Sequence, residues 1–342
     1  MIKRLALLVV FVVLAAAALA AWMYVRIDTP YRGFAEPEVF VDLPQGVGVQ
    51  GIAGRLAQAG VVPDALTFRV AARLSGAERR LQAGEYRFAG EASPAEVVGR
   101  LVRGDVARTN VTFPEGLTVR EMAAIFENSG LGSSADFVRA ASDGRLIAGL
   151  DPEARTLEGF LFPDTYALSR RATADVAVQA MVARFERAFD ADLRAAAAAQ
   201  GLSPREVVTL ASIVEKETAA SEERPLIAAV YRNRLRIGMP LQCDPTVIYA
   251  VMRAGRWHGN LTKQDLQMDS PYNTYRYAGL PPGPIASPGR ASLEAALHPA
   301  TVPYLYFVSR NDGTHAFAET LAEHSRNVDR WQVRYFRDRR RP

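Results

Sequence analysis

Two glutamates stand close together in a predicted helix over 207–220. On a wheel of about 100° per residue, Glu215 and Glu217 fall at opposite edges of an apolar stripe, and Lys216 points away. The stripe consists of Val207, Leu210, Ala211, Val214 and Thr218. A carboxyl at the rim of a buried stripe is partly desolvated, which raises its pKa and suits it to general acid catalysis. The alternative is that both are ordinary exposed helix residues.

Polar and aromatic residues are concentrated in three Pro-rich segments that follow, 241–249, 270–275 and 279–289. Aromatic faces stack on sugar rings, and fixed amides and carboxylates bind hydroxyl groups, so these segments suit a sugar groove. The candidates for substrate contact, or for orienting Glu215, are Asn233, Gln242, Asp244, Tyr272, Asn273 and Tyr275. Each of them is alternatively a residue that braces a loop. Glu158 and Asp164 are expected to cap or brace a turn.

Other chemistries find little support in the sequence. The four histidines lack metal-ligand spacing, so we expect no metal and no cofactor. The single cysteine, Cys243, excludes an internal disulfide and a cysteine-based zinc or iron–sulfur site. Motifs for acyl transfer, nucleotide hydrolysis and dinucleotide binding are missing in their required context.

The elements that must position the glutamates are predicted as an α+β arrangement. Ser203 and Glu206 form a capping box that begins the helix over 207–220, and a long helix over 173–200 precedes it, ended by Gly201. Towards the N-terminus, a strand, two helices, a return strand and a helix beginning after Ser93 predict a small α+β module over 38–110.

The N-terminus predicts a membrane segment. An uncharged run from Leu5 to Val25 is long enough to cross a hydrocarbon core of about 30 Å. Lys3 and Arg4 place its N-terminal end in the cytoplasm, so the remainder lies outside the inner membrane. The alternative is a cleaved signal peptide ending near Ala20. A polar linker over 28–37 follows.

The chain has 342 residues, of which 49% are hydrophobic and 23% charged, which indicates a globular protein of about two domains. The net charge of +4 is concentrated in an arginine-rich C-terminal segment, including a basic tail over 331–342. A nucleic-acid-binding protein would carry a basic face through its fold, so no nucleic acid partner is expected. The tail is a solvated helix end or a contact for anionic lipid or wall polymer.

Several motifs occur in order and resemble the YceG-like family of endolytic murein transglycosylases. They are Glu158–Tyr166, Leu210–Thr218, Tyr231–Met239, Leu241–Tyr249, Pro271–Tyr275, Gly279–Ile285 and His298–Ala300. The resemblance implies a single-pass anchor over 1–27, a LysM-like module over 38–110 and a YceG-like catalytic domain over 111–330. Cys243 stands where the family pattern has threonine.

The resemblance implies that Glu215 is the catalytic acid and that the enzyme cleaves MurNAc–GlcNAc bonds of nascent glycan strands without water. It implies 1,6-anhydroMurNAc ends, a role in terminating glycan elongation, and peptidoglycan synthases as partners. Glu217 is then an orienting, substrate-binding or structural residue. Two alternatives remain: a membrane-anchored wall-binding scaffold without activity, and a hydrolase that pairs Glu215 with Glu217, Asp244 or Glu158.

Overall fold

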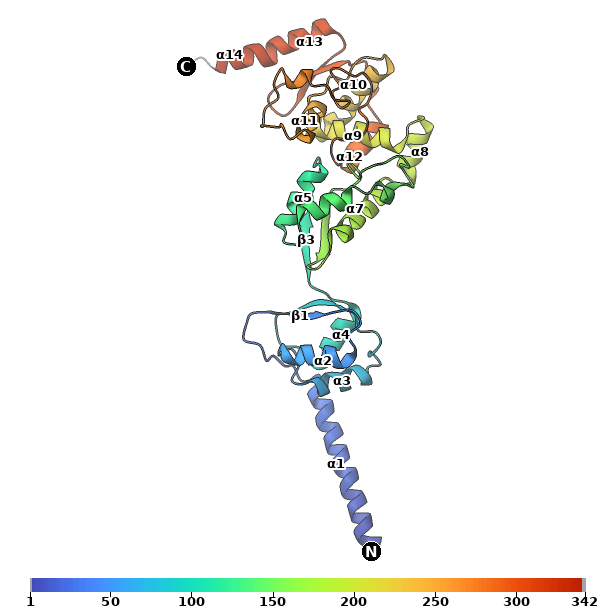
Figure 1. The fold of residues 1–342 in the computed structure, drawn as a ribbon, viewed down its shortest axis with the longest axis vertical. Coiled ribbons are helices and arrows are strands. Elements are labelled where there is room, and N and C mark those ends of the chain that lie inside the picture. The colour runs from blue at the N-terminus through green and yellow to red at the C-terminus, as the bar shows by residue number, and fades with distance from the viewer. Residues whose placement is uncertain (1, 340–342) are drawn as a thin grey trace. The chain divides into compact units, whose positions relative to one another are not determined.

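The computed structural model describes residues 2–339 and divides the chain into two compact units (Figure 1). The first contains the chain up to Thr109 together with Ala167–Arg171, and the second contains Asn110–Tyr166 and the chain from Ala172 onward. The division falls inside two paired strands, β3 (Arg108–Thr112) and β4 (Thr165–Ser169). The fold is therefore mixed α+β, as predicted. The end of the predicted basic tail, 340–342, lies outside the described residues.

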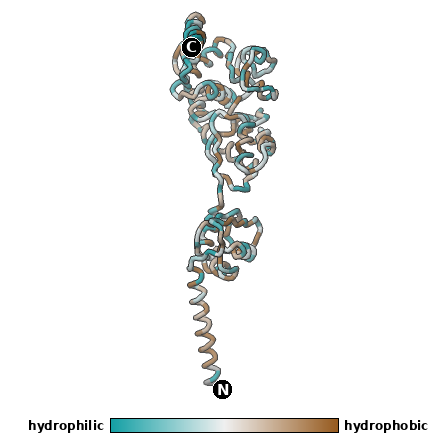
Figure 2. Tube along the Cα trace, turned by 90° about the vertical axis from the view of Figure 1, so that its left-hand side faces the viewer, coloured by the Kyte–Doolittle hydropathy of each residue, from teal (hydrophilic) through white to brown (hydrophobic). Residues whose placement is uncertain are grey.

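Helix α1 (Ile2–Asp28) is the apolar N-terminal helix that the sequence predicts (Figure 2). Its segment Leu7–Asp28 has a mean hydropathy of 2.5, and most of its side chains are exposed, so its length and composition are compatible with a single-pass membrane anchor. The helix ends on the first unit: Ile27 joins the core of that unit, and Arg26 pairs with Asp64 at 2.8 Å.

The first unit packs three helices against a two-stranded sheet. Strand β1 (Val39–Leu43) pairs antiparallel with β2 (Gly84–Phe88). The helices are α2 (Val49–Gln58), α3 (Ala65–Leu74) and α4 (Pro94–Arg103). Side chains such as Leu56, Phe68 and Tyr86 are fully buried between them. Helix α4 begins at the predicted capping box, because Ser93 and Glu96 exchange side-chain and backbone hydrogen bonds.

The second unit is mainly helical, and its helix α9 is surrounded by α8, α10, α11 and α12. Its strands beyond β3 and β4 are β5 (Tyr306–Ser309) and β6 (His315–Ala318), which pair antiparallel. Its helices are α5 (Val119–Asn128), α6 (Ser134–Ala141), α7 (Ala174–Ala188), α8 (Ala191–Ala199), α9 (Pro204–Glu217), α10 (Arg224–Arg236), α11 (Asp244–Arg253), α12 (Arg290–Leu297), α13 (Leu321–Val328) and α14 (Tyr335–Arg339), with short 3-10 turns and a π-helical segment between α13 and α14.

The prediction of one long helix over 173–200 is wrong, because the helix is broken between α7 and α8. Phe189 leaves the helical conformation and is fully buried, with its ring 5.8 Å from that of Phe185. Asp190 then begins α8 by accepting a hydrogen bond from the backbone N–H of Leu193 at 3.1 Å. Burial of Phe189 and the new N-cap together offset the lost helical hydrogen bonds. Gly201 ends α8 with a positive φ of 67°, as predicted.

The contribution of Asp190 as the N-cap of α8 can be tested by substitution. Replacing Asp190 with Ala removes the acceptor for Leu193 and is expected to lower the free energy of unfolding of the second unit by about 1 kcal/mol. Asp190→Asn keeps a capping oxygen and removes only the charge that faces Arg290 across a partly exposed pair, so its loss is smaller. Calorimetric melting compares the two variants. Equal losses would show that the ion pair, and not the cap, stabilises this break.

Candidate active site at the end of helix α9

Helix α9 is a core helix and not the half-exposed helix that the wheel predicts. It begins at the predicted capping box of Ser203 and Glu206, and every residue from Val207 to Val214 is buried. Exposure returns only in the last turn, where Lys216 is exposed. The helix ends at Glu217, and Thr218 is extended, so the predicted continuation to 220 is wrong. The two glutamates therefore lie in the last turn of a buried helix.

Glu215 lies in a buried network of hydrogen-bond donors. Its Oε1 accepts from Arg224 at 3.3 Å, and its Oε2 accepts from the backbone N–H of Gly289 at 3.0 Å and from the hydroxyl of Ser292 at 2.7 Å. The side chain is 6% exposed. The sequence predicts a partly desolvated carboxyl at the rim of the apolar stripe, whereas Glu215 is almost fully buried and ties α9 to α10 and to the beginning of α12.

A second carboxylate approaches the same arginine. Glu115 lies 3.7 Å from Arg224, and burial together with the charge of Glu215 raises the pKa of Glu115. A Cβ at Gly289 would lie 1.8 Å from a carboxylate oxygen of Glu115, so a larger residue at this position would require the Glu115 side chain to move. Glu115 and Glu215 therefore share the guanidinium of Arg224.

Glu217 has different surroundings. Its Oε1 accepts hydrogen bonds from the hydroxyl of Tyr231 at 2.5 Å and from the thiol of Cys243 at 3.1 Å. Burial raises the pKa of Glu217, and the hydrogen bonds from Tyr231 and Cys243 oppose that rise. The residue keeps partial exposure at the end of α9. Glu217 is thus the carboxyl of the pair whose surroundings favour holding a proton.

Three of the predicted site residues lie in the segments around Glu217. Gln242 directly precedes Cys243, is exposed and has a positive φ of 48°, a backbone conformation that is strained for a residue other than glycine. Asp244 begins α11, is exposed, and accepts a hydrogen bond from the hydroxyl of Tyr275 at 2.6 Å. The amide of Gln242, the carboxyl of Asp244 and the hydroxyl of Tyr275 are polar groups of the kind that bind sugar hydroxyls.

Both predicted asparagines brace loops. Asn273 is fully buried, donates to the carbonyls of Leu266 and Met268, and accepts from the backbone of Tyr275. These contacts favour the bracing alternative for Asn273. Asn233 donates to the carbonyls of Val302 and Tyr304, which holds the chain that leads into β5.

Tyr272 belongs to a separate cluster around Glu158. Its ring centroid lies 4.9 Å from that of Tyr249 and 5.2 Å from the guanidinium of Arg253. Glu158 accepts from the backbone N–H of Val119 and from the hydroxyl of Tyr249, which braces the beginning of α5, as the sequence predicts for a bracing residue. Asp164 likewise pairs with Arg184 at 2.7 Å.

Sequence reasoning missed the residues that surround the glutamates. Tyr231, Arg224 and Ser292 come from α10 and α12 and gave no local pattern that points to Glu215 or Glu217. Cys243 stands where the family pattern has threonine, and a thiol and a threonine hydroxyl can both donate to a carboxylate. This shared ability was the available signal for its contact with Glu217. Among the described residues, no group of three or more His, Cys, Asp or Glu side chains is arranged to hold a metal ion.

The buried carboxyl of Glu158 gives a pH-dependent prediction. Burial raises its pKa from 4.5 to about 7. The folded state favours the protonated form of Glu158. The contribution of this group to the free energy of unfolding is therefore greatest below about pH 4.5. It is lost as the pH rises towards about 7, by about 3 kcal/mol in total. Glu158→Gln is expected to abolish this part of the decline in melting temperature. Glu186→Gln, at an exposed position of α7, is the matched control. An unchanged pH profile in Glu158→Gln would contradict the prediction.

The sequence model of the YceG-like family matches residues 41–330. A curated endolytic murein transglycosylase of Bacillus subtilis is 30% identical over 88% of this chain and 87% of its own length. One of Streptococcus pneumoniae is 30% identical over 94% of this chain, which spans 63% of that relative's length. A crystal structure of a yceG-like protein from Listeria monocytogenes has a TM-score of 0.58 and 30% identity, and the match covers 85% of this chain and 99% of that one. The chain belongs to the YceG-like family.

Proposed function

We propose that this protein is an endolytic murein transglycosylase that cleaves the glycan strands of peptidoglycan. Family membership and relatives named for this activity support the reaction class. The observation that carries the proposal is the carboxyl of Glu217, partly exposed at the end of a buried helix, with a raised pKa and two hydrogen-bond donors on one oxygen. Such a group is suited to general acid catalysis.

The proposed reaction uses one carboxyl twice. The protonated carboxyl gives its proton to the oxygen of the MurNAc–GlcNAc bond as that bond breaks, and positive charge develops at C1 of MurNAc. The 6-hydroxyl of the same sugar attacks C1 and gives its proton back to the carboxylate. The products are a 1,6-anhydroMurNAc end and a GlcNAc end. Because the nucleophile is part of the substrate, its high effective concentration replaces a bound water.

Within this mechanism we assign the proton donor to Glu217, which departs from the expectation that Glu215 is the catalytic acid. The contacts of the two glutamates support the assignment. Both oxygens of Glu215 are taken up by donors, two of which, a guanidinium and a backbone N–H, can only donate. Both donors to Glu217 contact Oε1, so Oε2 is the oxygen that the described residues leave open for a proton. Glu215 then serves as the anion that fixes the end of α9.

The positions of the other residues near Glu217 suggest which of them orient it, which contact the sugar and which support the loops. Tyr231 and Cys243 orient Glu217. Gln242, Asp244 and Tyr275 are proposed to contact the sugar hydroxyls. Tyr272 and Asn233 are proposed to support the surrounding loops, and no metal or cofactor takes part.

The cellular setting is proposed as follows. Helix α1 anchors the protein once in the inner membrane, with its N-terminus in the cytoplasm and the catalytic domain over 111–330 in the periplasm. The LysM-like module over 38–110 holds the nascent strand. Cleavage close to the membrane terminates glycan elongation, with peptidoglycan synthases as partners.

Paired glutamine variants test the assignment of the proton donor. Glu217→Gln cannot donate a proton and is expected to lower the cleavage rate about 10²–10⁴-fold while the fold survives. Glu215→Gln weakens the contact with Arg224 and is expected to lower the melting temperature while the folded protein still cleaves. Mass spectrometry of products from purified peptidoglycan measures both. Retained cleavage in Glu217→Gln and its loss in folded Glu215→Gln would return the role to Glu215.

The same assay separates the alternatives. Anhydro ends support the transglycosylase, whereas products heavier by one water indicate a hydrolase. Binding to peptidoglycan without soluble products, by the wild-type protein, would indicate a scaffold without activity.

A tyrosine variant tests how the pKa of Glu217 is set. The hydroxyl of Tyr231 stabilises the charged form of Glu217, so Tyr231→Phe is expected to raise the pKa of Glu217 further. Because the acid must be protonated, activity falls as the pH rises through this pKa, and the alkaline limb of the kcat/KM profile should move to higher pH. Tyr304→Phe, whose hydroxyl does not contact Glu217, is the control. A shift to lower pH, or none, would argue against the assignment.

A further inference from the structure

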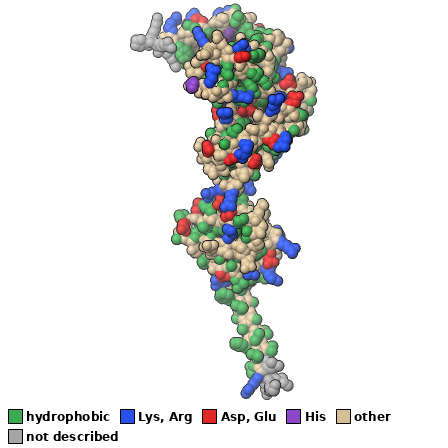
Figure 3. Space-filling view, viewed as in Figure 1, with side chains coloured by type: hydrophobic (Ala, Val, Ile, Leu, Met, Phe, Trp, Pro, Cys, Tyr) green, Lys and Arg blue, Asp and Glu red, His purple; other side chains and the backbone are tan. Residues whose placement is uncertain are grey.

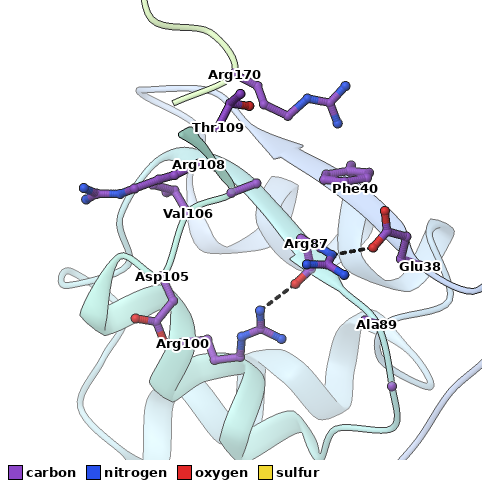
Figure 4. A pocket seen from close by; sticks show the side chains of 12 residues that line it. Glu38, Phe40, Arg87, Ala89, Arg100, Asp105, Val106, Arg108, Thr109 and Arg170 are labelled. Atoms are coloured by element: carbon purple, nitrogen blue, oxygen red, sulfur yellow. Dashed lines mark hydrogen bonds and ion pairs between the residues drawn. The ribbon is translucent and has the colours of Figure 1, made fainter. Parts of the chain in front are cut away.

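A pocket of about 750 Å³ lies entirely within the first unit and is distinct from the site at the end of α9 (Figure 4). Its walls come from β1, the end of β2 and α4. The segment Val106–Thr109 and Arg170, where the chain leaves and re-enters this unit, complete it. Its volume lies in the range of pockets that bind small ligands.

Positive charge dominates the lining. Arg87, Arg100, Arg108 and Arg170 outnumber the two acidic residues of the lining, Glu38 and Asp105. The carboxylate of Glu85, which is not part of the lining, lies 3.6 Å from Arg170 and offsets one of the two surplus positive charges. The space-filling view shows blue basic and red acidic side chains interspersed over the surface of the first unit (Figure 3). A pocket of this composition attracts anions.

The acidic residues do not neutralise all of the arginines. Glu38 pairs with Arg87, and Asp105 pairs with Arg103 outside the pocket at 2.9 Å. Arg100 donates instead to a backbone carbonyl, that of Arg87, at 2.5 Å. Among the described residues, neither Arg100 nor Arg108 has a carboxylate within ion-pair distance. The Arg100 guanidinium also lies 4.6 Å above the ring of Phe88, and the Arg108 side chain points away from the row of Arg87 and Arg100 (Figure 4). No carboxylate of the described residues neutralises these two guanidinium groups, so both can attract an anion from solution.

The pocket also has an apolar side. The guanidinium of Arg170 lies 4.5 Å above the ring of Phe40, and Figure 4 shows this stack beside the row formed by Glu38, Arg87 and Arg100. Val106 and Ala89 add aliphatic surface. A ligand that combines anionic groups with short aliphatic side chains fits such a lining better than a bare inorganic ion.

We propose that this pocket binds the carboxylates of the peptide stems that murein carries, an inference that rests on the proposed function. Guanidinium groups match carboxylates as planar, two-pronged donors. The alanine side chains of a stem would lie against Phe40 and Val106. Strand β1, which forms one wall of the pocket, lies on the side of the unit opposite to α1 (Figure 1). The first unit then recognises the peptide on the strand and not the glycan alone.

Binding of soluble fragments tests the proposal. The full chain in a zwitterionic detergent is titrated calorimetrically with a GlcNAc–MurNAc disaccharide carrying a tetrapeptide stem, with the same disaccharide lacking the peptide, and with inorganic phosphate. We expect the stem-bearing fragment to bind at least about tenfold more tightly than the other two. Equal affinity for the stem-free disaccharide would overturn the proposal, and equal or tighter binding of phosphate would reduce the pocket to a general anion site.

Charge-matched variants locate the binding. Arg100→Gln/Arg108→Gln is expected to remove the preference for the stem. Arg69→Gln/Arg73→Gln, at two exposed positions of α3, loses the same charge and should keep the preference. Equal weakening in both would show a general charge effect and contradict the pocket. If the Arg100→Gln/Arg108→Gln variant does not fold, the proposal is still tested by the affinities of the wild-type chain for the stem-bearing and stem-free disaccharides.

Cleavage of intact peptidoglycan by the same wild-type preparation separates the two proposals. Cleavage without a stem preference rejects the pocket and leaves the proposed function standing. A stem preference without cleavage rejects the proposed function and leaves a stem-binding protein.

Discussion

The end of one buried helix controls the chemistry proposed for this protein. Because α9 is enclosed from Val207 to Val214, the side chains of its last turn are held in place and partly removed from solvent. Burial there raises the pKa of Glu217, while Tyr231 and Cys243 fix one of its oxygens. A carboxyl that is desolvated, oriented and still reachable is what a proton donor requires. In the proposed mechanism, the reactivity of Glu217 therefore depends on the packing of α9.

Glu215 makes that packing possible from the other side of the helix. Its contacts with Arg224, Gly289 and Ser292 join the end of α9 to the beginnings of α10 and α12. Removing one partner of a buried ion pair is costly, because the other charge is left without compensation. Two glutamates separated by one residue thus divide their tasks, one holding the helix end and the other presenting a carboxyl. The difference between them lies in their neighbours and not in their residue type.

The parts of the structure that depend on local sequence were predictable, and those that depend on tertiary contacts were not. The capping boxes at Ser93 and Ser203 and the stop at Gly201 follow from short-range hydrogen bonding and backbone freedom. The break at Phe189 depends on a buried ring, which periodicity does not reveal. The wheel placed both glutamates at a rim, but it could not show that α10 and α12 would supply Arg224 and Ser292 to Glu215 alone.

Direct titration of the Glu217 carboxyl tests the central claim. Carbon-13 NMR of the protein labelled at glutamate side-chain carboxyls, with the Glu217 resonance identified by its absence in Glu217→Gln, follows protonation of this group alone. We predict that it takes up its proton at a pH clearly above the ordinary value of 4.5 for a glutamate. A midpoint at or below that value would contradict the account, because Glu217 would then be charged near neutral pH and unable to act as the acid.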